Sequence, residues 1–433
     1  MIDLRYRLKT IGFISALTVA AATAAAPSGA DTGAPPPRTG RINIYGNRIT
    51  KSYVIRRVIP LRPGDPYDKA MVDLARKRIP KLAGIDYSDI RVTYSLADST
   101  LSLDVAVTEK SASQGYPVVQ RGLENIFSFG AWAANENFRG RNETLGASAL
   151  FSGGTVVNAM WENPWLGEGP RIGIGLSGKY RNYKYVYDDL GGSFEGAGIE
   201  QYGGEFSLFY TFWSGFRILA AAGYAVTDGD EEGVTNEPGT DRFPLYSLGV
   251  RYDSRDSREW TWSGWYLKAD ATAVGPGEEA YSIVRGRLDA RVFIPLFDRT
   301  VLALQVRPQV NDGDRVPVYM REHLGGGMTL RSWDYGEFNA ASSMLTSAEF
   351  RIPVNFGRQN SIEDKLFAMS IHVFADAGAV WELDQSADDA DLWHGGYGVG
   401  VVLLNSWFKG LRFDYGWHEG SDGRAHFEIG TRF

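Results

Sequence analysis

Apolar and polar residues alternate with a period of two from about residue 125 to the end of the chain. In the last segment, AHFEIGTRF, Phe427, Ile429, Thr431 and Phe433 occupy one side, and polar residues or glycine occupy the other. The segments GLRFDYGWHEG and RGRLDARVFI repeat this pattern with charged residues opposite apolar ones. Such alternation predicts β-strands with one apolar face.

The apolar face of these strands is rich in aromatic residues, whereas the polar face carries charges of both signs. A soluble sandwich would also alternate, but strands of about 10 residues with this composition are typical of a membrane barrel with a polar lumen. Because lipid cannot satisfy an open sheet edge, the sheet must close. About 16 such segments are present, and single-chain barrels of this kind have an even number of strands. The sequence therefore predicts an all-β transmembrane β-barrel over residues 111–433, with the acidic stretches 227–241 and 383–394 as extracellular loops.

Residues 41–110 have a different pattern of apolar and polar residues. RINIYGN predicts a strand, Thr50 and Asp68 are candidate caps of two helices, and 90–96 and 100–107 alternate as strands. The predicted order is strand, helix, helix, strand, strand, which is a small α+β domain. It carries 13 Lys and Arg against 8 Asp and Glu, whereas 111–433 carry 28 against 42. The positive domain is suited to acidic partners or anionic headgroups, but ordinary surface variation would give the same balance.

The N-terminus has the features of an export signal. Basic residues precede an apolar stretch over 11–26, and small residues at 28–30 precede a cut before Asp31. We interpret residues 1–30 as a secretory signal peptide, because the apolar stretch is shorter than the roughly 20 residues of a permanent anchor helix. Residues 31–40, rich in Pro, Gly and Ala, are predicted to be a disordered linker.

The sequence offers little support for an enzyme active site or a ligand-binding motif. The chain has no cysteine, which excludes disulfides and thiolate sites. The match to G-x-G-x-x-G at 173–178 is not followed by a helical pattern, and the acidic loops lack EF-hand spacing. We predict no catalytic residue, no cofactor and no metal site. The acidic balance of the barrel also argues against nucleic acid as a partner.

Several motifs together resemble the outer-membrane protein 85 superfamily, in particular its BamA/TamA-like branch of bacterial surface antigens. The stretches that carry the resemblance are YMREHLGGGMTLRSW, SAEFRIPV, HVFADAGAVW, YDSRDSREWTWSGWYLKADA and the terminal phenylalanine. RINIYGNRIT and RPGDPYD resemble one POTRA domain at 41–110. Together the motifs extend over nearly the whole chain after the signal peptide.

The resemblance implies a site at Arg331, the tip of a long loop that folds into the lumen and pairs with carboxylates of the inner wall. Alternation places Asp376 and Glu349 on the inward face, and a guanidinium can bind such groups bidentately. Gly326 and Gly327 lead into the tip. Ser332 and Trp333 replace the Gly and Phe that follow the arginine in the family. The alternative is that Arg331 lies in an external loop.

By the same resemblance, Phe433, Ile429 and Phe427 form a C-terminal signal for membrane insertion. The expected function is to assist insertion or translocation of proteins at the outer membrane of a Gram-negative bacterium. The POTRA domain, in the periplasm, would bind unfolded client polypeptides or periplasmic partners. The barrel would open at a lateral seam between strands near 125–137 and 425–433. The single POTRA domain keeps two alternatives open, a barrel that handles outer-membrane lipids or remodels the membrane, and a passive channel. The oligomeric state cannot be inferred from the sequence.

Overall fold

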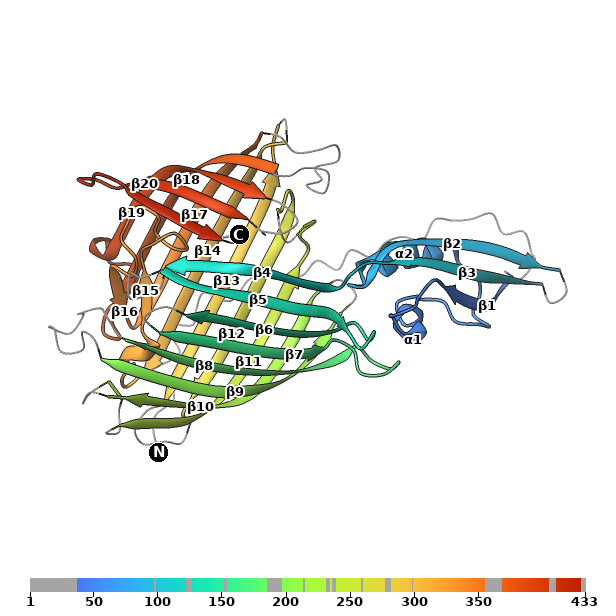
Figure 1. Cartoon of the computed structure of the whole chain (residues 1–433), viewed down its shortest axis with the longest axis horizontal. Helices are drawn as coiled ribbons and strands as arrows, with labels where there is room; N and C mark the ends of the chain where they lie inside the picture. The colour runs from blue at the N-terminus through green and yellow to red at the C-terminus, as the bar shows by residue number, and fades with distance from the viewer. Residues whose placement is uncertain are drawn as a thin grey trace.

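The computed structural model describes residues 37–429, apart from 97–98, 122–126, 152–153, 185–196, 213–214, 231–233, 236–238, 258–259, 277–281, 298, 355–367 and 405–409. The predicted signal peptide over 1–30 and Phe433 lie outside the described residues. The chain forms a small N-terminal unit and a large barrel (Figure 1). We call the barrel end beside this unit the proximal end and the opposite end the distal end.

The N-terminal unit confirms the predicted order of elements. It contains β1 (Arg38–Tyr45), α1 (Ser52–Arg56), α2 (Lys69–Arg78), the 3-10 turn η1 (Ile79–Lys81), β2 (Ile85–Ser95) and β3 (Thr100–Glu109), with sheet order β1-β3-β2. Asp68 caps α2 by accepting a hydrogen bond from the backbone N–H of Ala70. Thr50 does not cap α1, whose N-cap is Lys51. The last residues of the predicted linker are structured, because β1 begins at Arg38.

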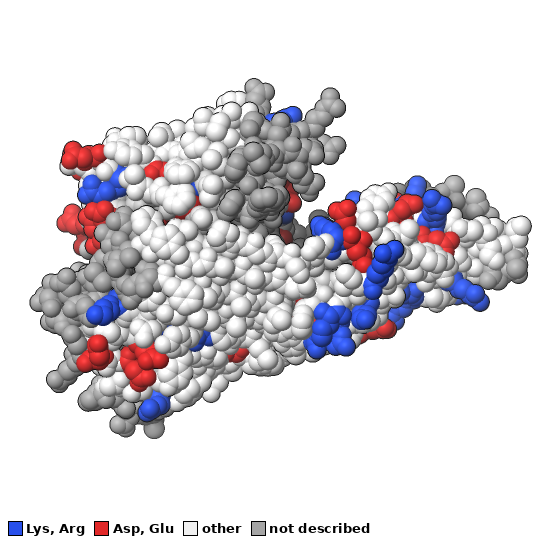
Figure 2. Space-filling view, viewed as in Figure 1, with Lys and Arg blue, Asp and Glu red and all other residues white. Residues whose placement is uncertain are grey.

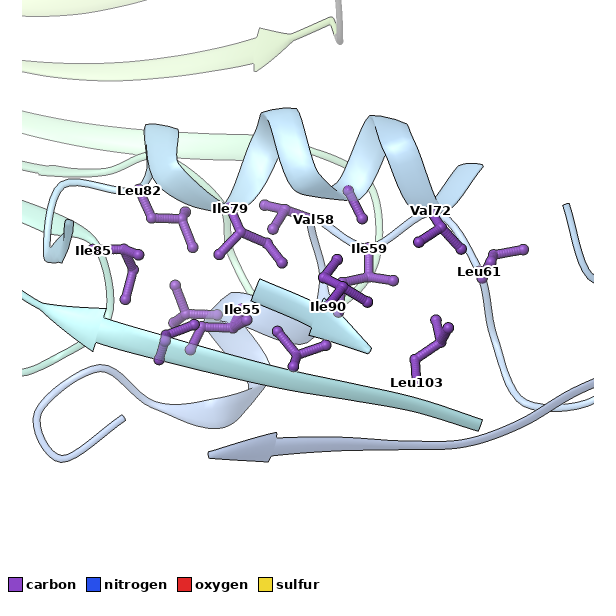
Figure 3. Close-up of a cluster of buried hydrophobic side chains, with 14 of the residues drawn as sticks. Ile55, Val58, Ile59, Leu61, Val72, Ile79, Leu82, Ile85, Ile90 and Leu103 are labelled. Carbon is purple, nitrogen blue, oxygen red and sulfur yellow. The ribbon is translucent and has the colours of Figure 1, made fainter. Parts of the chain in front are cut away.

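The core of this unit lies between its helices and its sheet (Figure 3). Ile55, Ile79 and Ile85 are fully buried, as is Leu103, which lies on the apolar side of β3. One member of the core comes from the barrel: Trp165, in the turn between β7 (Thr155–Asn163) and β8 (Ile172–Lys184), is only 8% exposed and packs in the same cluster.

The barrel is one antiparallel sheet of 16 strands, which confirms the predicted fold class. Besides β7 and β8, its strands are β4 (Ser113–Arg121), β5 (Phe127–Phe138), β6 (Glu143–Phe151), β9 (Gly198–Thr211), β10 (Arg217–Gly229), β11 (Thr240–Asp253), β12 (Gly264–Val274), β13 (Ile283–Pro295), β14 (Val301–Gly313), β17 (Ser342–Pro353), β18 (Ala368–Trp381), β19 (Trp393–Leu404), β20 (Leu411–Trp417) and β21 (Arg424–Ile429). Each strand pairs with the next along the chain, and β14 pairs with β17 across a long loop. The sheet curls until β21 and β4 approach each other (Figure 1).

The predicted first strand of the barrel was wrong. Residues 125–137 largely coincide with β5, and β4 precedes it as the first strand. The strand pattern of SQGYPVVQR is weak, because Gly115 and Pro117 interrupt it and it has a single aromatic residue. A proline in a strand is typical of an edge, where no partner needs its missing N–H. The seam of the barrel therefore lies between β4 and β21, not between β5 and the last strand.

The outward face of the barrel carries the apolar residues. Leu248 is 69% exposed and Trp265 is 61% exposed, and the cross-strand register keeps such residues on one side. In Figure 2 the barrel wall is mostly uncharged, and charged residues gather at its distal end and on the N-terminal unit. An apolar surface of this extent faces lipid rather than water.

Two further predictions can be compared with the strands. The glycines at 173–178 lie within β8, as the absence of a helical pattern indicated. The acidic stretches 227–241 and 383–394 lie at the distal end but are partly strand: β10 and β11 include both ends of the first, and β19 includes Trp393 and His394. None of the described helices is both long and apolar enough to cross a membrane.

The N-terminal unit is docked on the turns at the proximal end of the barrel. Asn137 donates a hydrogen bond to the hydroxyl of Thr50 at 2.9 Å, and the N–H of Lys51 donates to the carbonyl of Gly140 at 2.8 Å. The guanidinium of Arg57 lies 4.9 Å from the ring centroid of Trp165 and donates to its carbonyl at 2.8 Å. These contacts join the unit to the end of β5 and to the β5–β6 and β7–β8 turns.

The segment that meets the barrel is itself anchored within the unit. Glu109 accepts hydrogen bonds from the backbone N–H groups of Arg48, Ile49 and Thr50 at 2.8, 2.9 and 2.6 Å. Partial burial raises the pKa of Glu109, but these hydrogen bonds outweigh that effect and hold its pKa below the usual range. The end of β3 thus fixes the loop that carries Thr50.

Trp165→Ala should loosen the docking of the N-terminal unit. It removes a buried aromatic ring and the surface on which Arg57 stacks, and such changes cost roughly 3–5 kcal/mol in a core. We expect faster cleavage by a protease between the unit and the barrel, measured on the folded chain in detergent. Leu166→Ala is the control, because Leu166 is in the same turn but is 41% exposed. Equal cleavage rates in the two variants would contradict the assigned role of Trp165.

Candidate functional site

The loop between β14 and β17 folds back into the barrel and carries the predicted site. It contains the 3-10 turn η2 (Val318–Met320) and a short hairpin of β15 (Glu322–Leu324) and β16 (Phe338–Ala340). Leu324 and Leu330 are buried against Leu345 of β17. The loop is therefore packed on the inner wall and does not extend outward from the barrel.

The glycines at 325–327 allow the chain to turn at the tip of this hairpin. Gly325 and Gly326 have φ of 117° and 94°, values that residues with a side chain rarely adopt. The hydroxyl of Thr329 closes the turn by donating to the carbonyl of Gly325 at 2.7 Å and accepting from its N–H at 2.8 Å. At Gly327 a Cβ would overlap the carboxylate of Glu428 on β21. Gly326 and Gly327 thus shape the approach to Arg331 and do not contact its guanidinium.

The structure brings Arg331, Asp376 and Glu349 together. Arg331 is 0% exposed. Its Nε and Nη2 donate to the two carboxylate oxygens of Asp376 at 2.8 Å each, and its Nη1 donates to Glu349 Oε2 at 2.8 Å. The guanidinium carbon lies 3.4 Å from the centre of the Phe374 ring. Two neighbouring strands, β17 and β18, therefore supply two carboxylates and an aromatic face to one cation.

The site is larger than the sequence prediction, because four more charged or titratable residues extend it. Arg351 donates to Glu349 at 2.8 Å. Arg412 donates to Glu349 and to Asp414 at 2.5 Å each, and His372 Nε2 lies 2.6 Å from Asp414. Three arginines and three carboxylates are thus interleaved on β17, β18, β20 and the loop. Because opposite charges alternate, each buried charge has a partner of opposite sign within hydrogen-bond reach.

A sequence signal for these four residues existed. The alternation in GLRFDYGWHEG places Arg412 and Asp414 on the polar face, and the spacing of two places Arg351 on the same face as Glu349. His372 shares the face of Asp376 by the same rule. The pattern gives the inward direction of a side chain, but it does not indicate which inward residues meet the loop.

Glycines of the inner wall make room for the loop backbone. A Cβ at Gly416 of β20 would lie 2.6 Å from the carbonyl oxygen of Arg331, and one at Gly378 of β18 would lie 2.8 Å from Leu324. At Gly396 of β19 a Cβ would overlap the hydroxyl of Ser332. The loop backbone therefore packs closely against the wall at positions where glycine leaves space for it.

Trp333 holds the loop at the distal rim. Its ring stacks on His418 with centroids 3.6 Å apart, and its indole N–H donates to the carbonyl of Gly395 at 3.2 Å. Phe338 stacks in the same way on His394 at 3.7 Å. Thus Trp333, which departs from the expected family pattern, contributes a wall contact of its own.

The proposed C-terminal signal is separate from the Arg331 site. Phe427 packs against Phe413 with ring centroids 4.8 Å apart, and Ile429 pairs in register with Leu411. Both residues are on the outward side of β21, opposite the inward His426 and Glu428. The third predicted residue, Phe433, lies outside the described part of the chain.

Two family models match the sequence. Residues 137–433 match the Omp85 superfamily domain, and residues 37–110 match the surface antigen variable number repeat, a POTRA family. A comparison with curated proteins finds no match.

Solved structures show the same fold at low sequence identity. BamA from Haemophilus ducreyi lacking POTRA domains 1-3 aligns with a TM-score of 0.64 and 16% identity, covering 91% of this chain and 84% of that one. CdiB from Escherichia coli aligns with a TM-score of 0.66 and 12% identity over 91% and 76% of the two chains. CdiB from Acinetobacter baumannii gives 0.58 and 12% over 91% and 74%.

Arg331→Ala should destabilise the barrel and release the loop. Asp376 and Glu349 would lose a shared cation at a buried site, which costs roughly 3–5 kcal/mol when burial is complete. Arg331→Lys should restore only part of the loss, because an ammonium cannot bind Asp376 through two nitrogens. Unfolding in detergent, followed by the difference in gel mobility between heated and unheated samples, measures the effect. Arg424→Ala is the control, because its ion pair with Asp334 is at the exposed rim and should contribute under about 1 kcal/mol.

A double-mutant cycle separates pairing from general disruption. Asp376→Ala should resemble Arg331→Ala, and the double variant should be little worse than either single variant because both remove one interaction. Additive losses of stability would show that the two residues act independently and would contradict the pairing.

Gly396→Ala should displace the loop, because the added methyl overlaps Ser332. Overpacking at such a position typically costs about 1–3 kcal/mol. Gly395→Ala is a matched control one residue away, since a Cβ there meets only the carbonyl of Asp376 at 3.8 Å. Protease cleavage within the loop should accelerate in the first variant and remain unchanged in the second. If both variants behave like the original chain, the loop does not lie on this wall.

Proposed function

Because the chain belongs to the Omp85 superfamily, we propose that it assists the insertion or translocation of proteins at the outer membrane of a Gram-negative bacterium. In this proposal the POTRA unit, β1 to β3 with its helices, is in the periplasm and binds unfolded polypeptides. The barrel provides a lateral route at the seam between β4 and β21. The observation that carries the proposal is the seam itself.

The seam is where the sheet ends. The strand order begins at β21 and finishes at β4, and within the described residues no ladder joins these two strands. Every other strand of the barrel has a paired neighbour on both sides. Backbone groups left unpaired in lipid are costly, so a client strand that pairs with β4 or β21 would be stabilised there.

The POTRA unit is placed to deliver such a strand. Only residues 110–112 separate β3 from β4, so the unit is attached directly to one side of the seam. Its strand β2 lies at an edge of the sheet order β1-β3-β2 and offers backbone groups for strand addition. Near the end of β2, Tyr94 and Leu96 are exposed and give an extended client apolar contacts.

A lipid-handling function is the alternative, and the outward wall beside the seam favours it. A row of six small residues crosses adjacent strands in register: Gly115, Ala133, Ala147, Ala159, Gly178 and Gly204. At the far end of this row the wall is hollowed between Tyr180, Tyr202 and Tyr224. Acyl chains can approach the backbone closely there, which suits a barrel that disturbs lipid packing next to its seam.

Locking the seam tests the proposal. The chain has no cysteine, so pairs can be introduced cleanly. Cysteines at Pro117 or Val119 of β4, combined with one at Ala425 or Phe427 of β21, would join the outward faces of the two strands. We expect the cross-linked chain in liposomes to lose its ability to insert an unfolded outer-membrane protein and to regain it on reduction.

The control cross-link lies within the wall. A Cβ at Gly115 would be 3.6 Å from that of Ala133, so cysteines at these positions can form a disulfide between β4 and β5 without closing the seam. This variant should retain insertion. If the seam cross-link leaves protein insertion intact but abolishes lipid movement between leaflets, the lipid alternative is favoured. If it changes neither, both proposals fail.

A further inference from the structure

The lumen contains a second group of charges, away from the Arg331 site. Lys179 and Arg181 are on the inward face of β8, and Arg285 and Arg287 are on the inward face of β13. All four are nearer the distal end of their strands. The group lies beside the long loop, because Nη2 of Arg285 donates a hydrogen bond to the carbonyl of Met320 in that loop at 3.0 Å.

These cations are only partly balanced by carboxylates. Arg287 pairs with Asp270 at 2.9 Å, and Arg285 bonds neutral acceptors, the side chain of Asn311 at 2.9 Å and the carbonyl of Met320. Among the described residues, no carboxylate forms an ion pair with Lys179 or Arg181. Among the described residues, the charged side chains with an electrostatic effect on Lys179 are Arg181, Arg285 and Arg287, which are all cations. The Nε of Arg181 is buried and has no hydrogen-bond partner within the part of the chain that the structure describes.

Besides Asp270, two further carboxylates lie near this group without forming an ion pair with it. Glu322 of the long loop attracts Arg285 and Arg287 electrostatically, but among the described residues it makes no ion pair with either. Glu205 of β9 lines the same cavity as Lys179. It pairs in register with Ser177, whereas Lys179 pairs with Gly203. The group therefore keeps an excess of positive charge, although residues 111–433 as a whole carry more Asp and Glu than Lys and Arg.

Space for a ligand exists beside Lys179. A cavity of about 470 Å³ lies against the wall formed by β5 to β11. Lys179 lines it together with the hydroxyl and amide side chains of Ser177, Asn158, Gln201 and Thr227. Its volume exceeds that of a few water molecules and accommodates a small anion with its hydration shell.

We propose that Lys179, Arg181, Arg285 and Arg287 bind a phosphate-bearing anion in the lumen. Like charges held together repel one another, and a multivalent anion between them converts this repulsion into attraction. Arginine and lysine are the side chains best suited to phosphate, through paired N–H donors and a compact point charge respectively. The anion is either free in the aqueous lumen or the headgroup of a phospholipid. This site is independent of the seam and of the proposed function.

Pyrophosphate binding tests the site in the full chain. Titration calorimetry in detergent at low ionic strength should show one pyrophosphate bound per chain. Lys179→Gln and Arg181→Gln should each weaken binding about tenfold, the effect of losing one charge-assisted contact. Lys268→Gln is the matched control: Lys268 is also an exposed lumen cation, but it is in register with Asp289 on the neighbouring strand. It should change affinity less than twofold.

Two results would overturn the proposal: no binding to the original chain at millimolar pyrophosphate, or equal affinity in the original chain and the Lys179→Gln variant. The mobility difference between heated and unheated samples verifies that each variant is folded. Nanodiscs then identify the source of the phosphate. If phosphatidic acid added to phosphatidylcholine nanodiscs competes with pyrophosphate, a headgroup reaches the site. If it does not compete, the bound anion comes from the aqueous lumen.

Discussion

A sheet in lipid must satisfy its own backbone, because the bilayer core has no water to do so. This requirement explains why all sixteen strands form one antiparallel sheet that curls toward closure. It also makes the end of the ladder, between β21 and β4, the place where backbone groups are least well paired. Elsewhere each strand is paired with two neighbours, so only at that boundary can two strands separate without breaking a ladder of the described sheet. The outward apolar residues and the inward polar residues are both consequences of the same closed sheet.

The Arg331 network stiffens the wall on one side of the seam. It links the long loop to β17, β18 and β20 through alternating charges, and the loop backbone lies on wall glycines. On the other side of the seam, Trp165 and Asn137 fasten the POTRA unit to the turns that follow β5 and β7. The two sides are thus separately reinforced, and the strands between them connect two stiff regions.

The inner surface of the barrel has two electrostatic characters. Around Arg331 the charges are matched and buried, so the network is suited to fixing a position. Around Lys179 positive charge is in excess beside a cavity whose lining includes several polar side chains, so the group is suited to attracting a mobile anion. Because the two regions lie on different strands of one wall, the Arg331 network can fix the long loop while the Lys179 group binds a ligand in the same lumen.

Alternation by itself determined the fold class and the inward direction of Asp376 and Glu349, since the period of a strand fixes which side a residue faces. The resemblance added the loop that brings Arg331 to them. Only the tertiary structure decided which inward residues of distant strands meet, and so Arg351 and Arg412 were missed. It also decided that β4 is the first strand, because a short edge strand with glycine and proline gives little periodic signal. The burial of Trp165 in another unit had no local signal, because a turn sequence carries no information about the surface that it docks against.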